Sequence, residues 1–376
     1  MSNHLHIVSF TVPYPPDYGG AMDVFYKLKA LHAVGLDITL HCFLYDRSEA
    51  PELNKFCNKV FYYPRKTGFI SQLSFLPYIL FSRRSEELLK NLSVDGSPIL
   101  FEGLHTTYYL NHKTLAERIK IVRAHNIEHN YYYQLYLAEK KTGKKFFFLA
   151  EAVKLFFVQK RLHYANLIAA ISENDYRYFK RKFLNTFHLD AFHSSEEPDI
   201  IAGQGDYLLY HGNLSVPENL KAAIYLIENV FVNISFPVLI AGKNPSSFLI
   251  SKAKKHKHIR VVASPSITEM RELIRNAQGI IIFSFQSTGT KLKLLESLFY
   301  GRHCIVNNLI TEDANLISLC EAGNTSEELT DKIKGILQIE FDQAKINKRI
   351  KSLDAYSNKA GALLLKEKLI QTGAFQ

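Results

Sequence analysis

The sequence predicts an α/β protein with two doubly wound domains in tandem, each a parallel sheet covered by helices on both faces. Short apolar strands alternate with amphipathic helices over residues 4–183 and again over 207–306, a pattern typical of parallel sheets. Between them, the stretch 185–206 is polar, contains Gly and Pro, and has no clear period, as expected for an interdomain connection. Because ligands bind at the carboxyl ends of such strands, we expect a cleft that both domains face.

The first predicted domain covers residues 1–190. It opens with a strand, a loop rich in Pro and Gly, and a helix from Ala21 that carries Val24, Leu28 and Leu31 on one stripe. A second strand closes this βαβ unit, and further elements follow. The predicted strands are His4–Phe10, Leu36–Phe43, Pro98–Glu102, Lys120–Ala124 and Leu167–Ile171, with helices around 130–165 and 173–183.

The second predicted domain covers residues 200–354, and the segment 355–376 contains a last helix. Ser215 is a predicted helix cap, with Pro217 in the first turn that follows. The alternation of strands and helices is regular throughout this domain. The predicted strands are Tyr207–His211, Pro237–Ala241, Ile259–Val262, Gly279–Ser284 and His303–Val306, and the predicted helices include Ile267–Ala277 and Lys291–Tyr300.

Composition excludes several classes of protein. Of the 376 residues, 47% are apolar and 22% are charged, which is close to the average of globular chains and argues against disorder, collagen or a coiled coil. The net charge of +10 predicts an anionic partner: nucleic acid, anionic lipid or a phosphate-bearing substrate. Because no recognition motif accompanies the charge, the sequence does not favour nucleic acid.

Cysteine usage and the N-terminus predict a cytoplasmic protein that is at most peripheral to a membrane. The four cysteines form no C-x-x-C pair, which favours reduced thiols over a disulfide framework. The N-terminal residues lack the features of a signal peptide. No apolar stretch approaches the ~18 residues of a transmembrane helix.

The segment Ser287–Cys304 is the most informative for function. It follows an apolar strand, passes a Gly-containing loop and enters a helix, whose N-terminus offers free N–H groups to an anion. Lys291 and Lys293 lie in the first turn, where the helix dipole disfavours cations, so their placement indicates an anionic partner. Glu296 lies on the same face and can accept hydrogen bonds from a ribose diol. A surface helix with an ordinary Lys–Glu pair is the alternative.

This segment resembles the donor-binding signature of retaining glycosyltransferases of family four, which have the GT-B fold of two Rossmann-like domains facing a cleft. Gly289, Lys293, Glu296 and Gly301 match the signature in spacing. Further stretches resemble the family in the same order along the chain: YPPDYGG, VRAHNIEH, ISENDYRYF, HGNLSVPENLKA and LIAGKNPSSFL. The resemblance covers nearly the whole chain.

The resemblance implies transfer of a sugar, with retention at the anomeric carbon, from a UDP- or GDP-linked donor to a glycan or lipid-linked acceptor. It implies that Glu296 holds the ribose, that Lys293 and Lys291 stabilise the departing diphosphate, and that His125 orients the sugar. It also implies that the last helix returns to brace the first domain. The remaining implied donor-binding residues are Gly19, Gly20, Gly212, Asn213, Lys243, Gly289, Thr290 and Leu292.

Two departures from the family pattern keep alternatives open. Thr288 stands where the family has a second Glu, and the usual Arg of the donor domain has no counterpart in GNLSVPENLK. The alternatives are a nucleotide-sugar epimerase of the same fold and a degenerate nucleotide-binding or scaffold protein. No D-x-D sequence occurs, so a metal-dependent transferase is not supported, and no metal or other cofactor is expected.

Three further features have competing interpretations. His125, Glu128 and His129 spell H-x-x-E-H, an inverted zinc-peptidase pattern, but they directly follow a predicted strand. Glu102 ends a strand and is a candidate to meet an acceptor hydroxyl, with a buried structural carboxylate as the alternative. The aromatic stretches 65–84 and 140–166 have basic flanks, which favour either an anionic membrane surface or aromatic core helices.

Overall fold

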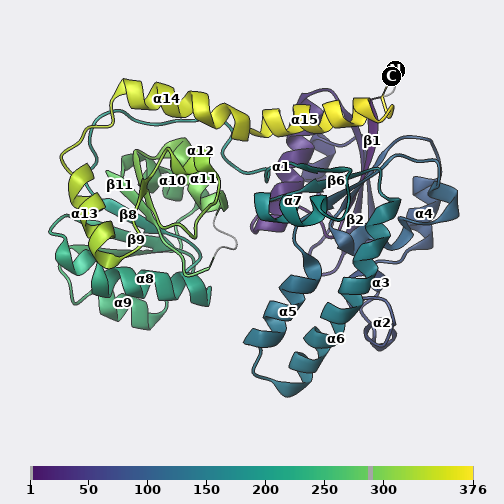
Figure 1. Cartoon of the computed structure of the whole chain (residues 1–376), viewed down its shortest axis with the longest axis horizontal. Helices are drawn as coiled ribbons and strands as arrows, with labels where there is room; N and C mark the ends of the chain where they lie inside the picture. Colours follow the sequence, from purple (N-terminus) through teal and green to yellow (C-terminus); the bar gives the residue numbers. More distant parts are fainter. Residues whose placement is uncertain (1–2, 287–290, 376) are drawn as a thin grey trace. The chain divides into compact units, whose positions relative to one another are not determined.

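The computed structural model describes residues 3–286 and 291–375, except the side chains of Phe69 and Lys291. The chain forms two compact units. Unit 1 comprises Met1–His193 and Asn358–Gln376, and unit 2 comprises Ser194–Ser357. Each unit contains one parallel sheet between layers of helices (Figure 1).

The sheet of unit 1 has seven strands in the order β3-β2-β1-β4-β5-β6-β7, and all its pairs are parallel. The direction of winding reverses between β1 and β4, which makes this the switch point where doubly wound sheets bind ligands. The strands are β1 (His4–Ser9), β2 (Asp37–Leu44), β3 (Lys59–Pro64), β4 (Ile99–Glu102), β5 (Lys120–Ala124), β6 (Leu167–Ala170) and β7 (Thr186–His188).

Two helices from opposite ends of the chain cover one face of this sheet. Leu28 and Leu31 of α1 (Gly19–Ala33) share a fully buried cluster with Leu365 and Leu369 of α15 (Asn358–Gln371), so the C-terminal helix completes the core of unit 1. The other helices of the unit are α2 (Phe69–Gln72), α3 (Tyr78–Phe81), α4 (Glu86–Leu92), α5 (Glu128–Ala138), α6 (Thr142–Val158) and α7 (Glu173–Lys180), with 3-10 turns at Pro51–Lys55, Leu104–Tyr109, Lys113–Leu115 and Gln159–Tyr164.

The predicted single helix around 130–165 is two helices. The chain breaks between α5 and α6, where the Glu139 carboxylate accepts hydrogen bonds from the N–H groups of Lys140 and Lys141, and the pair projects from the sheet as a hairpin (Figure 1). Within α6, Leu155 and Val158 are buried, while Phe157 is exposed.

Unit 2 repeats the same winding. Its sheet has six parallel strands in the order β10-β9-β8-β11-β12-β13, with the switch point between β8 and β11. The strands are β8 (Leu208–His211), β9 (Val238–Gly242), β10 (Ile259–Ala263), β11 (Gly279–Ile282), β12 (His303–Val306) and β13 (Glu321–Ala322). The helices are α8 (Pro217–Asn229), α9 (Ser247–Ala253), α10 (Ile267–Asn276), α11 (Lys291–Tyr300), α12 (Ala314–Ile317), α13 (Ser326–Ile336) and α14 (Gln343–Leu353), with 3-10 turns at Phe231–Asn233 and Asp354–Tyr356.

Part of the predicted interdomain connection belongs to unit 1. Strand β7 lies inside the stretch 185–206 and pairs with β6. The buried side chains of Leu189 and Phe192 follow it, and the guanidinium of Arg123 donates to the carbonyl oxygens of Leu189 and Asp190. A strand of three residues is too short to show a period, so sequence periodicity does not predict it.

Candidate functional site

The switch point of unit 2 brings a glycine against a partly buried lysine. Gly212 directly follows β8, and a Cβ atom at this position would lie 3.0 Å from the Nζ of Lys293. Lys293 stands in the first turns of α11, after β11, and donates to the Oδ1 of Asn219 in α8. Two strand ends and two helix starts therefore place one cation at the carboxyl edge of the sheet.

The pKa of the Lys293 amine makes its charge sensitive to a bound anion. Burial lowers its pKa from 10.5 to about 8, while the negative charge of Glu218 partly opposes this. A cation removed from water is stabilised strongly when a phosphate supplies the missing counter-charge. Lys293 is therefore suited to bind a diphosphate at this edge.

Glu296 lies one turn further along α11. Burial raises the pKa of its carboxyl group to about 7, and the positive charge of Arg271 in α10 opposes this in part. Donors such as the hydroxyl groups of a ribose favour the ionised form. A sugar diol is thus a fitting partner for this carboxylate.

The other residues predicted for the donor site differ in burial, and some lie outside the described residues. Asn213 and Lys243 are exposed after β8 and β9, and Leu292 is partly buried in α11. Gly301 follows α11, where a Cβ atom would lie 2.0 Å from Cδ1 of Ile280 in β11, so its role is close packing of helix on sheet. Thr288, Gly289, Thr290 and the side chain of Lys291 lie outside the described residues.

Sequence reasoning missed the residues of α8 at this site. The Oε1 of Glu218 accepts a hydrogen bond from the N–H of Phe285, at 2.8 Å, and so ties the start of α8 to the end of β11. Asn219, next to it, holds Lys293. Both lie directly after Pro217 in the first turn of the predicted helix. Their place at a helix start that follows a strand is the sequence feature that could have identified them.

The switch point of unit 1 holds a buried charge cluster. The cluster spans α1, β4 and β5, and its side chains are almost fully buried. Lys27 Nζ lies 2.8 Å from Asp23 Oδ2 and 2.9 Å from Glu102 Oε1, and His125 Nε2 lies 2.9 Å from Glu102 Oε2. The members of the buried charge cluster are Asp23, Lys27, Glu102, Arg123 and His125.

The cations keep both carboxylates of the cluster ionised. Burial alone would raise the pKa of each acid, but Arg123 and Lys27 hold the pKa of Asp23 far below its ordinary value, and Lys27 and His125 lower that of Glu102. Glu102 is fully buried, with both oxygens paired. The contact of Glu102 with an acceptor hydroxyl stays a prediction, and the alternative of a buried carboxylate agrees with this pairing, in which Glu102 holds His125.

This cluster does not form a peptidase zinc site. One oxygen or nitrogen each of Asp23, Glu102 and His125 lie within 4.8 Å of one another, but the Lys27 ammonium already pairs with both carboxylates. His125 precedes α5, while His129 lies on α5 with its ring against Phe156. The two histidines of the H-x-x-E-H pattern therefore point to different partners.

Gly19 and Gly20 occupy the first turn of α1, at the same edge of the sheet. A Cβ atom on Gly20 would lie 2.9 Å from the ring of Phe10, and that ring packs edge-on against His125, with the centroids 5.4 Å apart. The absence of side chains lets the start of α1 approach the end of β1 closely. Phe10 therefore lies against both the start of α1 and the ring of His125, and the N–H groups of the helix start can bind an anion at this edge.

The part of the chain that contains Gly212, Lys293 and Glu296 matches a known protein family. Residues 205–338 match the family model described as "Glycosyl transferases group 1". The matched range lies within unit 2 and includes Gly212, Lys293 and Glu296. A group 1 domain supports glycosyl transfer and does not favour the epimerase or scaffold alternatives.

The similarity to other known proteins covers most of the chain. An "Uncharacterized 44.6 kDa protein in cps region" of Klebsiella pneumoniae is 26% identical over 311 residues, which are 78% of this chain and 79% of that protein. The structure is similar to sucrose-phosphate synthase from Thermosynechococcus elongatus, with 14% identity, 99% of each chain covered and a TM-score of 0.68. It is also similar to Anabaena HepE in complex with UDP and glucose, with 10% identity, 98% and 99% covered and a TM-score of 0.63.

These likenesses show the fold, which is the GT-B arrangement of two Rossmann-like domains. Together with the group 1 domain they support a glycosyltransferase. Within the described part of the chain, no helix combines the length and apolar character needed to cross a bilayer.

Proposed function

We propose that the protein is a retaining glycosyltransferase that moves a sugar from a UDP- or GDP-linked donor to a glycan or lipid-linked acceptor. The observation that carries the proposal is Lys293, a desolvated cation at the β8–β11 switch point, held against a glycine and inside the range that matches the group 1 model. A cation here can stabilise the negative charge that develops on the diphosphate when its bond to the sugar breaks.

In this proposal the bond between C1 of the sugar and the diphosphate oxygen breaks while the acceptor oxygen bonds to C1 on the same face. The acceptor proton passes to the departing phosphate, so charge develops on the diphosphate. Lys293 and the N–H groups at helix starts stabilise that charge, and Glu296 holds the ribose. These groups replace the divalent ion of metal-dependent transferases, so we propose that transfer needs no metal.

His125 orients the donor sugar from unit 1. Glu102 holds its Nε2 at 2.9 Å, and Phe10 packs on the ring, which fixes the imidazole and leaves Nδ1 as the nitrogen that can meet a sugar hydroxyl. A group held in this way loses little conformational entropy when the sugar binds. We expect His125→Ala to lower turnover more than it lowers donor affinity.

The pH dependence of donor binding tests the role of Lys293. A nucleotide-sugar is the appropriate probe, because its diphosphate has no proton to lose near neutral pH. Since the anion prefers the protonated amine, affinity should fall as the pH rises through the free-protein pKa of Lys293, about 8. A separate fall below about pH 7, where Glu296 takes up a proton, should occur whether or not the lysine is present. Calorimetry on Lys293→Met should show weak binding at every pH, whereas the exposed control Lys255→Met should behave as wild type. Equal affinity in Lys293→Met would remove the lysine from the site.

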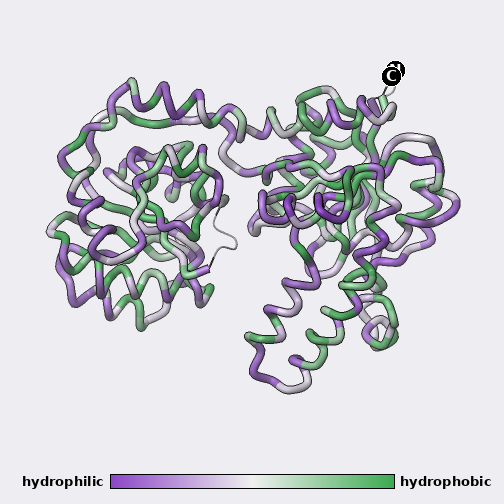
Figure 2. Tube along the Cα trace, in the orientation of Figure 1, coloured by the Kyte–Doolittle hydropathy of each residue, from purple (hydrophilic) through white to green (hydrophobic). Residues whose placement is uncertain are grey.

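The α5–α6 hairpin supports a lipid-linked acceptor at an anionic membrane. Figure 2 shows hydrophobic stretches on this hairpin, and Phe146, Phe156 and Phe157 are 66%, 48% and 59% exposed. Lysines flank the turn between the helices at 140, 141, 144 and 145. Exposed aromatic rings beside lysines are the pattern that binds the interface of an anionic bilayer.

Vesicle sedimentation tests the membrane proposal. We expect the protein to bind vesicles that contain phosphatidylserine, to bind neutral vesicles weakly, and to lose binding in the double variant Phe156→Ser/Phe157→Ser. Phe248→Ser is a matched control, because Phe248 is 55% exposed but lies in unit 2. Equal sedimentation of both variants would contradict the proposal.

A further inference from the structure

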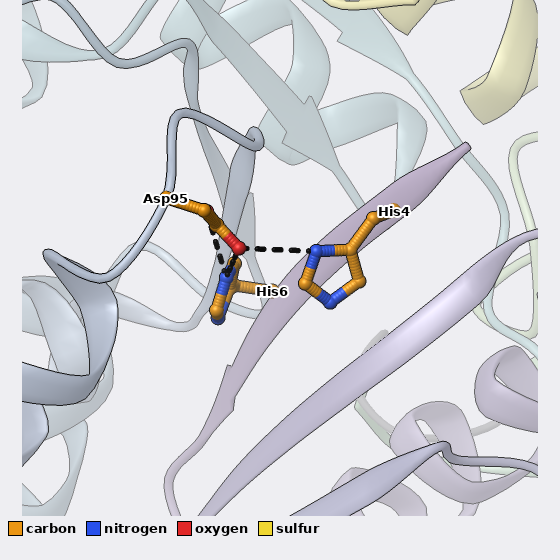
Figure 3. A group of neighbouring side chains, drawn as sticks. All are labelled: His4, His6 and Asp95. Atoms are coloured by element: carbon orange, nitrogen blue, oxygen red, sulfur yellow. Dashed lines mark hydrogen bonds and ion pairs between the residues drawn. The ribbon is translucent and has the colours of Figure 1, made fainter. Parts of the chain in front are cut away.

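A second group of histidines lies at the opposite edge of the unit 1 sheet. His4 and His6 lie on β1, two residues apart and therefore on one face of the sheet, and Asp95 reaches them from the loop between α4 and β4 (Figure 3). His4 is the first residue of β1, so the group lies at the amino ends of the strands. Glu102 and His125 lie at their carboxyl ends. This group is thus separate from the proposed transfer site.

Three ligand atoms converge in this group. Asp95 Oδ2 lies 3.2 Å from His4 Nδ1 and 3.0 Å from His6 Nε2, as the dashed lines of Figure 3 show, and all three atoms lie within 4.8 Å of one another. Ligands about 2.0 Å from a tetrahedral zinc ion are ~3.3 Å apart. The two carboxylate–imidazole distances are already close to this value.

The outer atoms of all three side chains are engaged. The Nε2 of His4 lies 2.8 Å from the Oγ1 of Thr39, and the Nδ1 of His6 lies 2.9 Å from the Nε2 of His41. Each of these partners can accept a hydrogen bond from the N–H of the histidine, which leaves the nitrogen that faces Asp95 with a lone pair. This is the usual support of a metal-binding histidine.

The same holds for the carboxylate. Asp95 Oδ1 accepts a hydrogen bond from the N–H of Ser97 and pairs with Arg118. The hydrogen-bonded chain beyond His6 continues from His41 Nδ1 to the hydroxyl of Tyr63, at 2.8 Å. Oδ2 is the oxygen that lies within 3.2 Å of both ring nitrogens. Nδ1 of His4 also lies 3.0 Å from Oγ of Ser97, and Nε2 of His6 lies 3.2 Å from Oδ1, so a bound ion would replace these two contacts.

We propose that His4, His6 and Asp95 bind one zinc ion through Nδ1, Nε2 and Oδ2, with water as the fourth ligand. Two imidazoles and one carboxylate suit zinc, whereas calcium and magnesium prefer all-oxygen sites. The partial exposure of His4 and Asp95, at 23% and 34% of their side chains, gives the ion and the water an entry. The ion joins β1 to the loop before β4 and stabilises unit 1 without a part in sugar transfer.

Zinc titration of the untagged, chelator-treated full chain tests the proposal. We expect wild type to bind one zinc ion and to gain melting temperature from it, and cobalt to give the absorption of a tetrahedral site. His4→Gln and Asp95→Asn should each lose the stoichiometric binding. Both residues are partly exposed, so these variants should fold. Thr39→Val, which removes only the partner of His4, should weaken binding about tenfold or more.

His256→Gln is the matched control, because His256 and His258 form the same H-x-H spacing in unit 2. It should bind zinc as wild type does. Binding that persists in His4→Gln and Asp95→Asn, or that falls in His256→Gln, would place the ion elsewhere and overturn the proposal. The absence of stoichiometric binding to wild type would also overturn it, and would leave a metal-free hydrogen-bonded group.

Discussion

Glu296 makes the folded protein less stable above neutral pH, because burial raises its pKa from 4.5 to about 7. The unfolded chain releases this proton at its ordinary pKa, so the stability contributed by the folded, protonated form is lost as the pH rises from 4.5 through 7. We expect Glu296→Gln to stabilise the protein by roughly 2 kcal/mol above pH 7 and much less near pH 4.5, while nucleotide affinity falls. Denaturant unfolding and calorimetry at both pH values measure this.

The exposed residue Glu340 provides the control for this experiment, since Glu340→Gln should change neither quantity. Opposite signs for stability and affinity are the mark of a residue selected for binding at a cost to the fold. If Glu296→Gln bound nucleotide as tightly as wild type, the carboxylate would have no contact with the donor.

In contrast to Glu296, the ionised carboxylate of Glu102 stabilises the fold. Its carboxylate pairs with the ammonium of Lys27 and with His125, fully out of water. Removing one partner leaves a buried cation uncompensated, which costs about 3–5 kcal/mol. We expect Glu102→Gln to lose this much stability in chemical unfolding at pH 7, and the exposed control Glu49→Gln to lose none. A fully stable Glu102→Gln protein would show that Asp23 alone neutralises Lys27.

At the scale of elements, some glycines are needed for the close packing of the loops at the proposed donor site, and others are not. A Cβ atom on Gly242, at the end of β9, would lie 1.7 Å from the carbonyl oxygen of Gly212. Neither backbone can yield without moving the loop after β8, whose Gly212 lies against Lys293. Gly335 lies inside α13, and a Cβ atom there would meet no described atom within 4 Å.

We therefore expect Gly242→Ala to destabilise unit 2 and abolish nucleotide binding, and Gly335→Ala to stabilise the helix by roughly 0.5–1 kcal/mol. Melting temperatures with and without nucleotide measure both effects. A tolerated Gly242→Ala would mean that the β8 and β9 loops are free to separate.

The sequence predicted most strands and the position of α11, because buried parallel strands and amphipathic helices have strong local periods. It failed where structure depends on one local contact or on few residues. The break between α5 and α6 rests on the Glu139 carboxylate, and β7 has three residues.

Within the sites, sequence spacing predicted residues that share one element, such as Lys293 and Glu296. It could not pair residues from different elements, such as Lys293 with Gly212, or Glu102 with Lys27. The H-x-H spacing of His4 and His6 is visible in the sequence, but Asp95 joins them only through the fold.

At the scale of the whole molecule, we propose different functions for the two units, whose sheets are wound in the same way. In this proposal the diphosphate and ribose contacts belong to unit 2, and His125, the acceptor contacts and the hairpin proposed to bind the membrane belong to unit 1. The proposed zinc ion adds a metal that serves stability alone. Stability and donor binding should therefore respond differently to a chelator.

A thermal-shift panel of UDP, GDP, ADP, CMP and nucleotide-sugars, each with and without EDTA, tests the central claim of a metal-free donor site most directly. A ligand at 100 times its dissociation constant adds ~2.7 kcal/mol of stability. We expect UDP or GDP to raise the melting temperature by the same increment in both conditions, even where EDTA lowers the starting value. No shift with any nucleotide would contradict the donor site, and a shift that EDTA abolishes would contradict its independence of metal.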